Sequence, residues 1–424
     1  MRIILTIDLI LWIIISLLYS YQFYYLFYMI FNGSKKDKVF EVKKLNKIAV
    51  VIPARNEENV IGHLIESIKN QNYDKDLLEI YVIADNCDDK TKEVSQSLGA
   101  KVFERFNKVN VGKGFALNYF FNKILKEEND IDAFVVLDAD NLLDENFIYE
   151  MNRVYSNGYD VLTSYRNSKN YDTNWISAGY SLWFLREAKF LNNPRMNLNT
   201  GCAISGTGFL VDKKLIEKNN NWDFFLLTED IQFSIKNALD GVKIGYAKDA
   251  ELFDEQPTTF KQSYKQRLRW AKGFYQVFFK YHKNLIKEIT TLKSFAVYDM
   301  FVTVFPAIFL TIIDFILYTT IFFYSLLVKK DGLLLFTSII KIPLINMGLF
   351  YLLLYSIGVV TLVSEWKKIH AKTYKKILYT FTFPIFLLSY IPISIIAIFK
   401  KVKWVPIEHN VEINMEQINK KRKS

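Results

Sequence analysis

Residues 47–53, KIAVVIP, form the continuous apolar run that decides the fold. Such a run is typical of a strand buried on both faces, as in a parallel sheet covered by helices. The next segment, residues 57–70, places its apolar side chains at helical spacing: Val60, Ile61, Leu64, Ile65 and Ile68. A buried strand followed at once by an amphipathic helix indicates the start of an α/β domain.

The same alternation continues through the middle of the chain. It predicts strands at 79–84, 101–105, 133–138 and 160–165, and helices at 89–98 and 114–127. We therefore predict an α/β fold with a mostly parallel sheet and right-handed crossovers.

Polar side chains gather where the predicted strands end. They are Arg55 and Glu57 after the first strand, Asp85 after the second, and Asp138 and Asp140 after a later one. Ligands of open α/β sheets bind beyond the carboxyl ends of the strands. Random placement would scatter polar residues to both edges, so their convergence predicts a ligand site.

Asp138 and Asp140 stand two residues apart. On extended backbone both side chains would point to the same side. Hard carboxylate oxygens at this spacing suit Mg²⁺ or Mn²⁺ that carries a diphosphate. The alternative is a solvated acidic turn, and the companion residues at the same edge favour the metal.

Two further residues indicate how a nucleotide would be held. Asp85 could contact the base or cap the following helix, and we expect Asp88 or Asp89 to be the cap. Lys113 lies between two glycines that would let the backbone approach a phosphate closely. The spacing matches neither a Walker A loop nor a Rossmann fingerprint.

Later residues are candidates for catalysis and acceptor binding. Asp230 could take a proton from an acceptor hydroxyl, or it could be a favourable charge at a helix N-terminus. Arg269 offers a cation to a leaving diphosphate and Trp270 a flat face to a sugar, although both types are common interfacial anchors. Gly206 and Thr207 belong to a Ser-Gly-Thr-Gly stretch that could approach an acceptor or form a simple turn.

Long apolar blocks flank the globular region. Of the 424 residues, 51% are hydrophobic and 16% aromatic, which is high for a soluble protein. The blocks are 3–31, 296–328, 333–364 and 377–399, and each could hold a spanning helix of about 20 residues. We predict four spans, give or take one. The expected parts are an N-terminal spanning helix at 1–32, a globular domain at 45–280, interfacial helices and about three spans at 281–400, and a basic tail at 401–424.

The net charge of +10 comes from basic residues that cluster beside these blocks. That placement fits anionic lipid and the positive-inside rule better than nucleic acid. It predicts a multi-pass cell-membrane protein with a cytoplasmic globular domain. The basic residues of the tail favour a cytoplasmic tail as well. One span in each block would instead place the tail on the opposite side of the membrane. Pro384 and Pro392 could break the last block into a re-entrant pair.

Four motifs occur in order and at suitable spacing: Asp85, Asp138-Ala139-Asp140, Thr228-Glu229-Asp230 and Gln266-x-x-Arg269-Trp270. Together they resemble the D, DxD, TED and QxxRW signature of membrane-bound family 2 glycosyltransferases. The likeness is to the processive type, which includes the cellulose, chitin, hyaluronan and poly-N-acetylglucosamine synthases. The opening VVIPARNEENVIGHLIESIKNQ is similar as well. A weaker likeness, to a tryptophan motif found after the spans, involves Trp404.

The resemblance implies a GT-A fold and a nucleotide-sugar donor, with UDP-N-acetylglucosamine and UDP-glucose expected first. The residues it assigns to the donor are Pro53, Arg55, Glu57, Asp85, Lys113 and Asp138. The metal, Mg²⁺ or Mn²⁺, would lie on Asp138 and Asp140.

The same resemblance assigns the other end of the site. Asp230 would be the catalytic base, with Glu229 beside it. The acceptor and the diphosphate would meet Gln266, Arg269, Trp270, Gly206 and Thr207.

The implied reaction is an inverting transfer of a sugar to a growing polysaccharide at the membrane. One alternative is a single transfer to a lipid acceptor. A more distant alternative is a transporter or scaffold with an inactive cytoplasmic domain. Membrane lipids would be partners and nucleic acid would not, and the sequence does not reveal whether there are accessory subunits.

Overall fold

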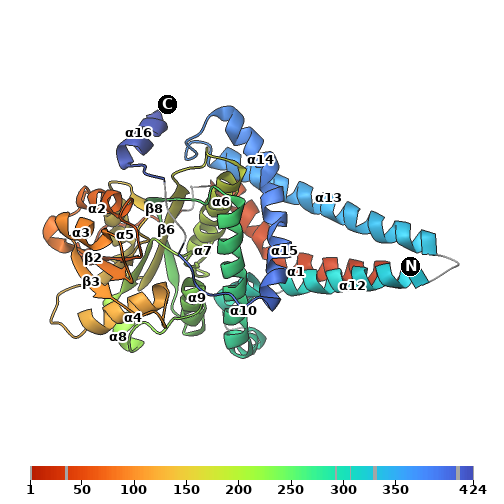
Figure 1. Cartoon of the computed structure of the whole chain (residues 1–424), viewed down its shortest axis with the longest axis horizontal. Helices are drawn as coiled ribbons and strands as arrows, with labels where there is room; N and C mark the ends of the chain where they lie inside the picture. Colours follow the sequence, from red (N-terminus) through yellow and green to blue (C-terminus); the bar gives the residue numbers. More distant parts are fainter. Residues whose placement is uncertain are drawn as a thin grey trace.

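The chain folds into a globular α/β domain from which long apolar helices project (Figure 1). The computed structural model describes residues 2–33, 37–291, 294–305, 307–327, 332–406 and 411–423. In Figure 1 the sheet lies at one end of the molecule, and three helices extend from the other end: α1 (Arg2–Asn32), α12 (Ala307–Leu327) and α13 (Gly332–Ser364).

The sheet in the described residues has eight strands in the order β3-β2-β1-β4-β7-β6-β8-β5. Their bounds are β1 Ile48–Ala54, β2 Leu78–Asp85, β3 Lys101–Arg105, β4 Ala133–Val136, β5 Leu142–Leu143, β6 Val161–Ser168, β7 Phe209–Asp212 and β8 Ile244–Asp254. The strands β3, β2, β1 and β4 run parallel, as do β6 and β8, whereas β7 and β5 pair antiparallel. The predicted α/β class with a mostly parallel sheet is confirmed.

Helices cover the sheet and continue beyond it. The first group is α2 Ile61–Lys69, α3 Thr91–Ser97, α4 Lys113–Ile124, α5 Phe147–Tyr155, α6 Trp175–Glu187, a π-helical turn Ala188–Asn192, α7 Asn193–Leu198, α8 Lys213–Lys218 and α9 Glu229–Leu239. The second group is α10 Phe260–Thr290, α11 Phe295–Val304, α14 Thr373–Leu388, α15 Tyr390–Phe399 and α16 Met415–Lys423.

Strand β1 lies inside the sheet, which explains its unbroken apolar sequence. It pairs with β2 on one side and β4 on the other, and residues 48–52 are fully buried. Helix α2 covers it with the apolar stripe seen in the sequence, including Leu64 and Ile68. The continuous apolar run of β1 and the helical apolar stripe of α2 therefore belong to the same hydrophobic core.

The backbone around Asp138 differs from the prediction. The predicted strand 133–138 ends at Val136, and the chain then turns, with the Asn141 N–H donating to the Asp138 carbonyl at 3.1 Å. Asp138 and Asp140 are thus presented by a turn, and the expectation of extended backbone was wrong. A turn of this kind brings two nearby side chains together without strand geometry.

Three stretches are long and apolar enough to cross a membrane among the described residues: Leu9–Asn32, Leu344–Ser364 and Thr373–Phe399. The last is divided at Ser389 into α14 and α15, and Pro384 lies inside α14. Figure 1 shows α15 running across the axes of α1 and α12, near the end of these helices that is closer to the globular domain. The block is therefore divided, but at Ser389 and not at Pro384 or Pro392, and the re-entrant pair stays a prediction.

The C-terminal tail returns to the globular domain. Ile418 of α16 packs on Leu142 and Phe253, and the Arg422 guanidinium donates to Asp144 at 2.8 Å and Glu251 at 3.0 Å. The tail thus contacts the globular domain, and the side of a membrane on which both lie stays a prediction.

Candidate active site

A cavity of about 770 Å³ lies between the carboxyl ends of the central strands and the apolar helices. All but one of the residues singled out in the sequence line it: Pro53, Arg55, Glu57, Asp85, Lys113, Asp138, Asp140, Gly206, Glu229, Asp230, Gln266, Arg269 and Trp270. The exception is Thr207. Segments more than 200 residues apart therefore meet in one space.

Thr207 is not among the residues that line the cavity, and it contacts the turn that carries Asp138. Its side chain is buried, and its hydroxyl accepts from the Asp138 N–H at 2.9 Å and donates to Asn141 Oδ1 at 2.5 Å. The prediction that it meets the acceptor or the diphosphate has no support in this geometry. Thr207 instead holds the turn that carries Asp138.

Asp85 ends β2 and lies buried at one end of the cavity. The Arg105 guanidinium donates to its carboxylate at 2.5 Å. Burial raises the pKa of Asp85, and the charge of Arg105 opposes that rise. The N-cap of α3 is Lys90, so the expectation of Asp88 or Asp89 at that position was wrong, although Asp89 accepts from the Thr91 N–H at 3.0 Å. Asp85 is therefore not required as a cap.

Lys113 opens α4 and reaches into the cavity. Its ammonium donates to Asp138 at 2.5 Å and to the Gly206 carbonyl at 2.8 Å. The preceding Gly112 has φ +132°, which favours glycine, and a Cβ on Gly114 would lie 1.9 Å from the Phe224 carbonyl oxygen. A lysine fixed at a helix N-terminus makes this corner attractive to an anion.

The residues predicted for a divalent ion are Asp140 and Asp138. Asp140 is buried, and its carboxylate accepts from the Glu255 N–H at 3.0 Å. No group of three or more His, Cys, Asp or Glu side chains able to hold a metal occurs in the described part of the chain. Mg²⁺ is usually bound by one or two carboxylates, with phosphate and water completing its shell. The donor set therefore fits an ion that arrives with a diphosphate.

Glu229 and Asp230 lie in the first turn of α9. Burial raises the pKa of both carboxyls, and the adjacent Asp230 helps to raise that of Glu229 to about 7. The Arg269 guanidinium donates to the Leu227 carbonyl at 3.2 Å, just before this turn. A Cβ on Gly273 of α10 would lie 2.5 Å from the Thr228 side chain, so α10 and this turn pack closely.

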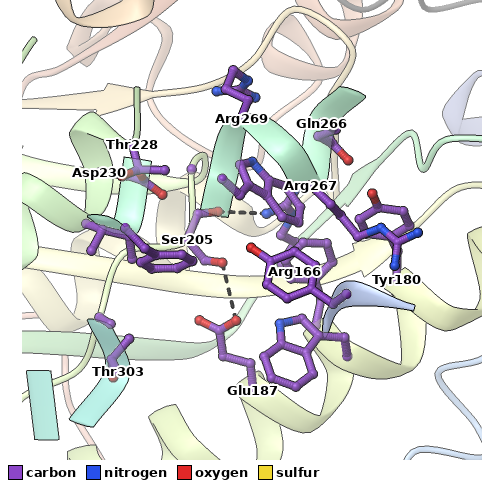
Figure 2. Close-up of a pocket in the computed structure, with 18 of the residues that line it drawn as sticks. Arg166, Tyr180, Glu187, Ser205, Thr228, Asp230, Gln266, Arg267, Arg269 and Thr303 are labelled. Atoms are coloured by element: carbon purple, nitrogen blue, oxygen red, sulfur yellow. Dashed lines mark hydrogen bonds between the residues drawn. The ribbon is translucent and has the colours of Figure 1, made fainter. Parts of the chain in front are cut away.

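The QxxRW residues form another wall of the cavity. Trp270 meets Tyr180 and Phe184 edge-on, with ring centroids 5.7 and 6.3 Å away. The Gln266 side-chain oxygen is buried without a hydrogen-bond partner in the described structure. Figure 2 shows Gln266 and Arg269 on the same side of the pocket, with Asp230 across from them.

Sequence reasoning missed an ion pair in the wall. The Arg166 guanidinium forms an ion pair with Asp254. It also donates to the Ser205 carbonyl at 2.7 Å, and the Ser205 hydroxyl donates to Glu187 (Figure 2). Burial raises the pKa of Asp254 to about 6, while Arg166 opposes the rise. Asp254 ends β8, so the strand-end rule could have found it. Arg166 lies within β6, and we see no sequence signal for it.

The apolar helices supply the rest of the lining. Residues from α1, α13 and the α14–α15 pair face the same cavity, among them Trp12, Ile15, Phe350, Leu353, Phe386 and Ile395. The tail adds Trp404, whose ring lies 5.4 Å from the Arg55 guanidinium. The cavity is thus polar at the sheet edge and apolar at the helices.

The family follows from comparison of the chain with known sequences. The profile described as "Glycosyltransferase like family 2" matches residues 46–273, more than half of the chain. The chain therefore belongs to the family 2 glycosyltransferases, and it is an enzyme of that class.

Individual relatives point to the same class. The chain is 28% identical over 307 residues to the probable glycosyltransferase YdaM of Bacillus subtilis, covering 67% of this chain and 69% of the relative. It is 24% identical over 241 residues to the beta-monoglucosyldiacylglycerol synthase of Synechocystis, covering 55% of this chain and 49% of the relative. It is 24% identical over 271 residues to the poly-beta-1,6-N-acetyl-D-glucosamine synthase of Staphylococcus aureus, covering 63% of this chain and 62% of the relative.

A solved structure shares the fold. The mannosyltransferase PcManGT of Pyrobaculum calidifontis, in complex with GDP-Man and Mn²⁺, matches with a TM-score of 0.54 and 14% identity. The match covers 91% of this chain and 99% of that one. The predicted GT-A-like fold is confirmed.

Proposed function

We propose that this chain transfers a sugar, with inversion, from a nucleoside-diphosphate sugar to an acceptor held at a membrane. The observation that carries the proposal is the single cavity, which joins a cluster of carboxylates and cations to a wall of apolar helices. A nucleotide-sugar suits the first part and an acceptor the second. The complex of PcManGT with GDP-Man and Mn²⁺ supports a nucleotide-sugar and a divalent ion for this fold.

In this proposal the donor lies at the sheet edge. Asp85 and Glu57 would face the base. Lys113 would meet the phosphates, since it is anchored at a helix N-terminus beside Asp138. Asp140 and Asp138 would hold Mg²⁺ or Mn²⁺. When bound, the ion would offset negative charge on the departing diphosphate.

Asp230 would act as the general base. Its burial raises its pKa, which makes the carboxylate a stronger base than an exposed aspartate. It would take the proton of an acceptor hydroxyl as the oxygen bonds to the anomeric carbon and the bond to the diphosphate breaks. Arg269 would stabilise charge on the leaving group, and Trp270 would pack against the acceptor.

The apolar wall supports a membrane location. The helices α1 and α13 contain stretches suited to crossing a bilayer, and the basic residues beside the apolar blocks favour a cytoplasmic globular domain. We propose the parts 1–32, 45–280, 281–400 and 401–424 as N-terminal span, catalytic domain, membrane and interfacial helices, and tail.

Two acceptors fit this arrangement. A growing polysaccharide is favoured by the QxxRW motif and by the likeness to the poly-N-acetylglucosamine synthase. A lipid acceptor is favoured by the apolar wall and by the likeness to the monoglucosyldiacylglycerol synthases. Both place the sugar-accepting end near Trp270.

The test uses the purified full-length chain in detergent with UDP-glucose, UDP-N-acetylglucosamine and GDP-mannose, with Mn²⁺ or with EDTA. We expect one donor to release nucleoside diphosphate only with metal and acceptor, and Asp230→Asn to abolish that release. Sizing of the labelled product separates a polymer from a single transfer. The same assay is repeated in membranes that contain native lipid. If no donor releases nucleoside diphosphate there either, the proposal is contradicted.

A further inference from the structure

Two oppositely charged side chains at the end of α6 face the cavity without an ion pair. They are Arg186 and Glu187, which both line the cavity and are partly exposed. Within the described residues, neither forms a salt bridge with the other or with a third side chain. The neighbouring Arg195 also lines the cavity, but Asp299 neutralises it at 2.7 Å. Arg186 and Glu187 therefore keep polar groups that the fold itself does not use.

Each of these two side chains is held at one atom and open at another. Arg186 Nη2 donates to Gln22 Oε1 on α1 at 2.8 Å, and Glu187 Oε2 accepts from the Ser205 hydroxyl at 3.3 Å. In the part of the chain that the structure describes, Arg186 Nε and Nη1 and Glu187 Oε1 have no hydrogen-bond partner, and none of these three atoms is fully buried. They can therefore bond to a ligand in the cavity.

An aromatic face of α6 connects these charges to the tryptophan of the QxxRW motif. Residues 180, 183, 184 and 187 recur at helical spacing, so they share one face of the helix. Tyr180 and Phe184 contact Trp270 edge-on. Trp183 lies beside the charged pair, with the Arg186 guanidinium 5.1 Å from its ring centroid. Residue 187 lies about one helical turn, or about 5 Å, beyond Phe184.

The Ser205-Gly206 segment places the same pair near the proposed base. A Cβ on Gly206 would lie 4.0 Å from Asp230 Oδ2 and 3.8 Å from Arg166 Nη1. The preceding Ser205 bonds to both Arg166 and Glu187 (Figure 2). Since Gln22 of α1 holds Arg186, the pair lies where the apolar helices close the cavity.

An open carboxyl oxygen beside an open guanidinium selects the chemistry of the ligand. A hydroxyl group both donates and accepts hydrogen bonds, so the hydroxyls of one sugar can satisfy Glu187 and Arg186 together. A fully ionised phosphate would bond to Arg186 but would bring no donor to Glu187. A hydrocarbon chain would leave both groups unpaired, which costs free energy in a buried place. The Trp183 ring adds an apolar face on which a sugar ring can pack.

We propose that Arg186, Glu187 and Trp183 form a subsite for a second sugar of the acceptor, next to the sugar that meets Trp270. This inference rests on the proposed function, in which the cavity holds the acceptor beside the apolar helices. It adds that the acceptor is a saccharide of at least two sugar rings, in preference to a lipid without sugar. Gln22 is a positioning residue, because it holds the Arg186 guanidinium from α1.

The probes are cellobiose, N,N′-diacetylchitobiose and mannobiose, each compared with its monosaccharide. They are added to the full-length protein in lipid nanodiscs, with Mn²⁺ and the matching nucleoside diphosphate. Titration gives the affinity, and saturation-transfer NMR shows which rings of the probe contact the protein. For at least one probe we expect the wild type to bind the disaccharide at least tenfold more tightly than the monosaccharide, with signal on both rings. Binding of no disaccharide, or signal on one ring only, would overturn the proposal.

Variants locate the second ring. Glu187→Leu and Arg186→Met keep the bulk of the side chain and remove its polar groups. Each should lose at least tenfold in disaccharide affinity and the signal of the second ring, whereas monosaccharide affinity should change less. Glu217→Leu and Lys265→Met make the same exchanges of charge for bulk at exposed positions outside the cavity, and should match the wild type. Equal disaccharide affinity in all five proteins would refute the subsite.

Arg186→Met also loses the bond to Gln22, so this variant can fail to fold. The wild type then decides through modification of arginine with phenylglyoxal and mapping by mass spectrometry. The disaccharide should protect Arg186, and equal modification with and without it would count against the subsite. All of these are binding measurements. A protein that binds both rings but transfers no sugar would contradict only the proposed reaction, and one that transfers sugar without protection of Arg186 would contradict only the subsite.

Discussion

The guanidinium of Arg55 lies 5.4 Å from the ring of Trp404, which joins the first strand–helix turn of the catalytic domain to the C-terminal tail. The Trp404 ring also lies within 3.6 Å of the position that a Cβ on Gly112 would take. Two segments separated by almost the whole chain thus close one end of the cavity. The tail is therefore part of the wall around the proposed donor site.

Trp404→Ala should weaken donor binding. A cation–π contact contributes about 0.5–2 kcal/mol, so we expect the KM for the donor to rise about 2- to 30-fold with a smaller change in kcat. Steady-state kinetics with the preferred donor provide the measurement. Phe399→Ala, at an exposed position outside the cavity, is the control and should behave as the wild type. A donor KM that is equal in all three proteins would argue against a tail contribution.

Asp230→Asn should abolish sugar transfer while donor binding persists. General base catalysis contributes about 10²- to 10⁴-fold, and an amide cannot take the proton. Transfer rates and UDP affinity are measured on the same preparation. Asp240→Asn removes an exposed carboxylate beyond the C-terminal end of the same helix and should leave both quantities unchanged. Near-normal transfer by Asp230→Asn would show that another group is the base.

The pH dependence of kcat/KM should report the buried acids. Burial raises the pKa of Asp230, and the base works only when ionised, so activity should rise with pH through that raised pKa. The acidic limb is expected above the ordinary aspartate value of about 3.9. Glu229, with its pKa of about 7, lies beside Asp230, so the limb belongs to the pair. A limb at the ordinary carboxylate value would contradict this expectation.

Asp140→Asn should remove the metal dependence of donor binding. The wild type is expected to bind UDP more tightly with Mn²⁺ than with EDTA, because the ion links the carboxylate to the diphosphate. Titration calorimetry measures both affinities without any turnover. Asp144→Asn, which lies near this turn and pairs with Arg422, is the control. If Mn²⁺ still tightens UDP binding to Asp140→Asn as in the wild type, the metal assignment is wrong.

Gly114→Ala should destabilise the catalytic domain. The added Cβ would lie 1.9 Å from the Phe224 carbonyl oxygen, and overpacking of this kind costs about 1–3 kcal/mol or more. The thermal midpoint in detergent is the measurement. Gly348→Ala in α13 adds its Cβ to open space and should be neutral or slightly stabilising. Equal midpoints for Gly114→Ala and the wild type would mean that α4 can shift freely.

Prediction from the sequence succeeded where one short pattern reports one local environment. The run around Val50 predicted a buried strand, and the stripe through Leu64 predicted the helix that covers it. Asp85, Asp140 and Asp230 were placed by their motifs, and all three line one cavity, although their roles stay predictions. Strand geometry at Asp138 failed because the hydrogen bond that forms the turn depends on local backbone closure, which period-2 spacing does not encode.

The sequence by itself determined the class of fold, the order of the chemical motifs and the apolar segments, because each depends on neighbouring residues and their spacing. Only the tertiary structure decided that Thr207 holds the Asp138 turn and that Arg166 pairs with Asp254. These depend on which side chains meet after distant segments pack. Charge and burial at such places are properties of the assembled chain, so a single stretch of sequence does not contain them.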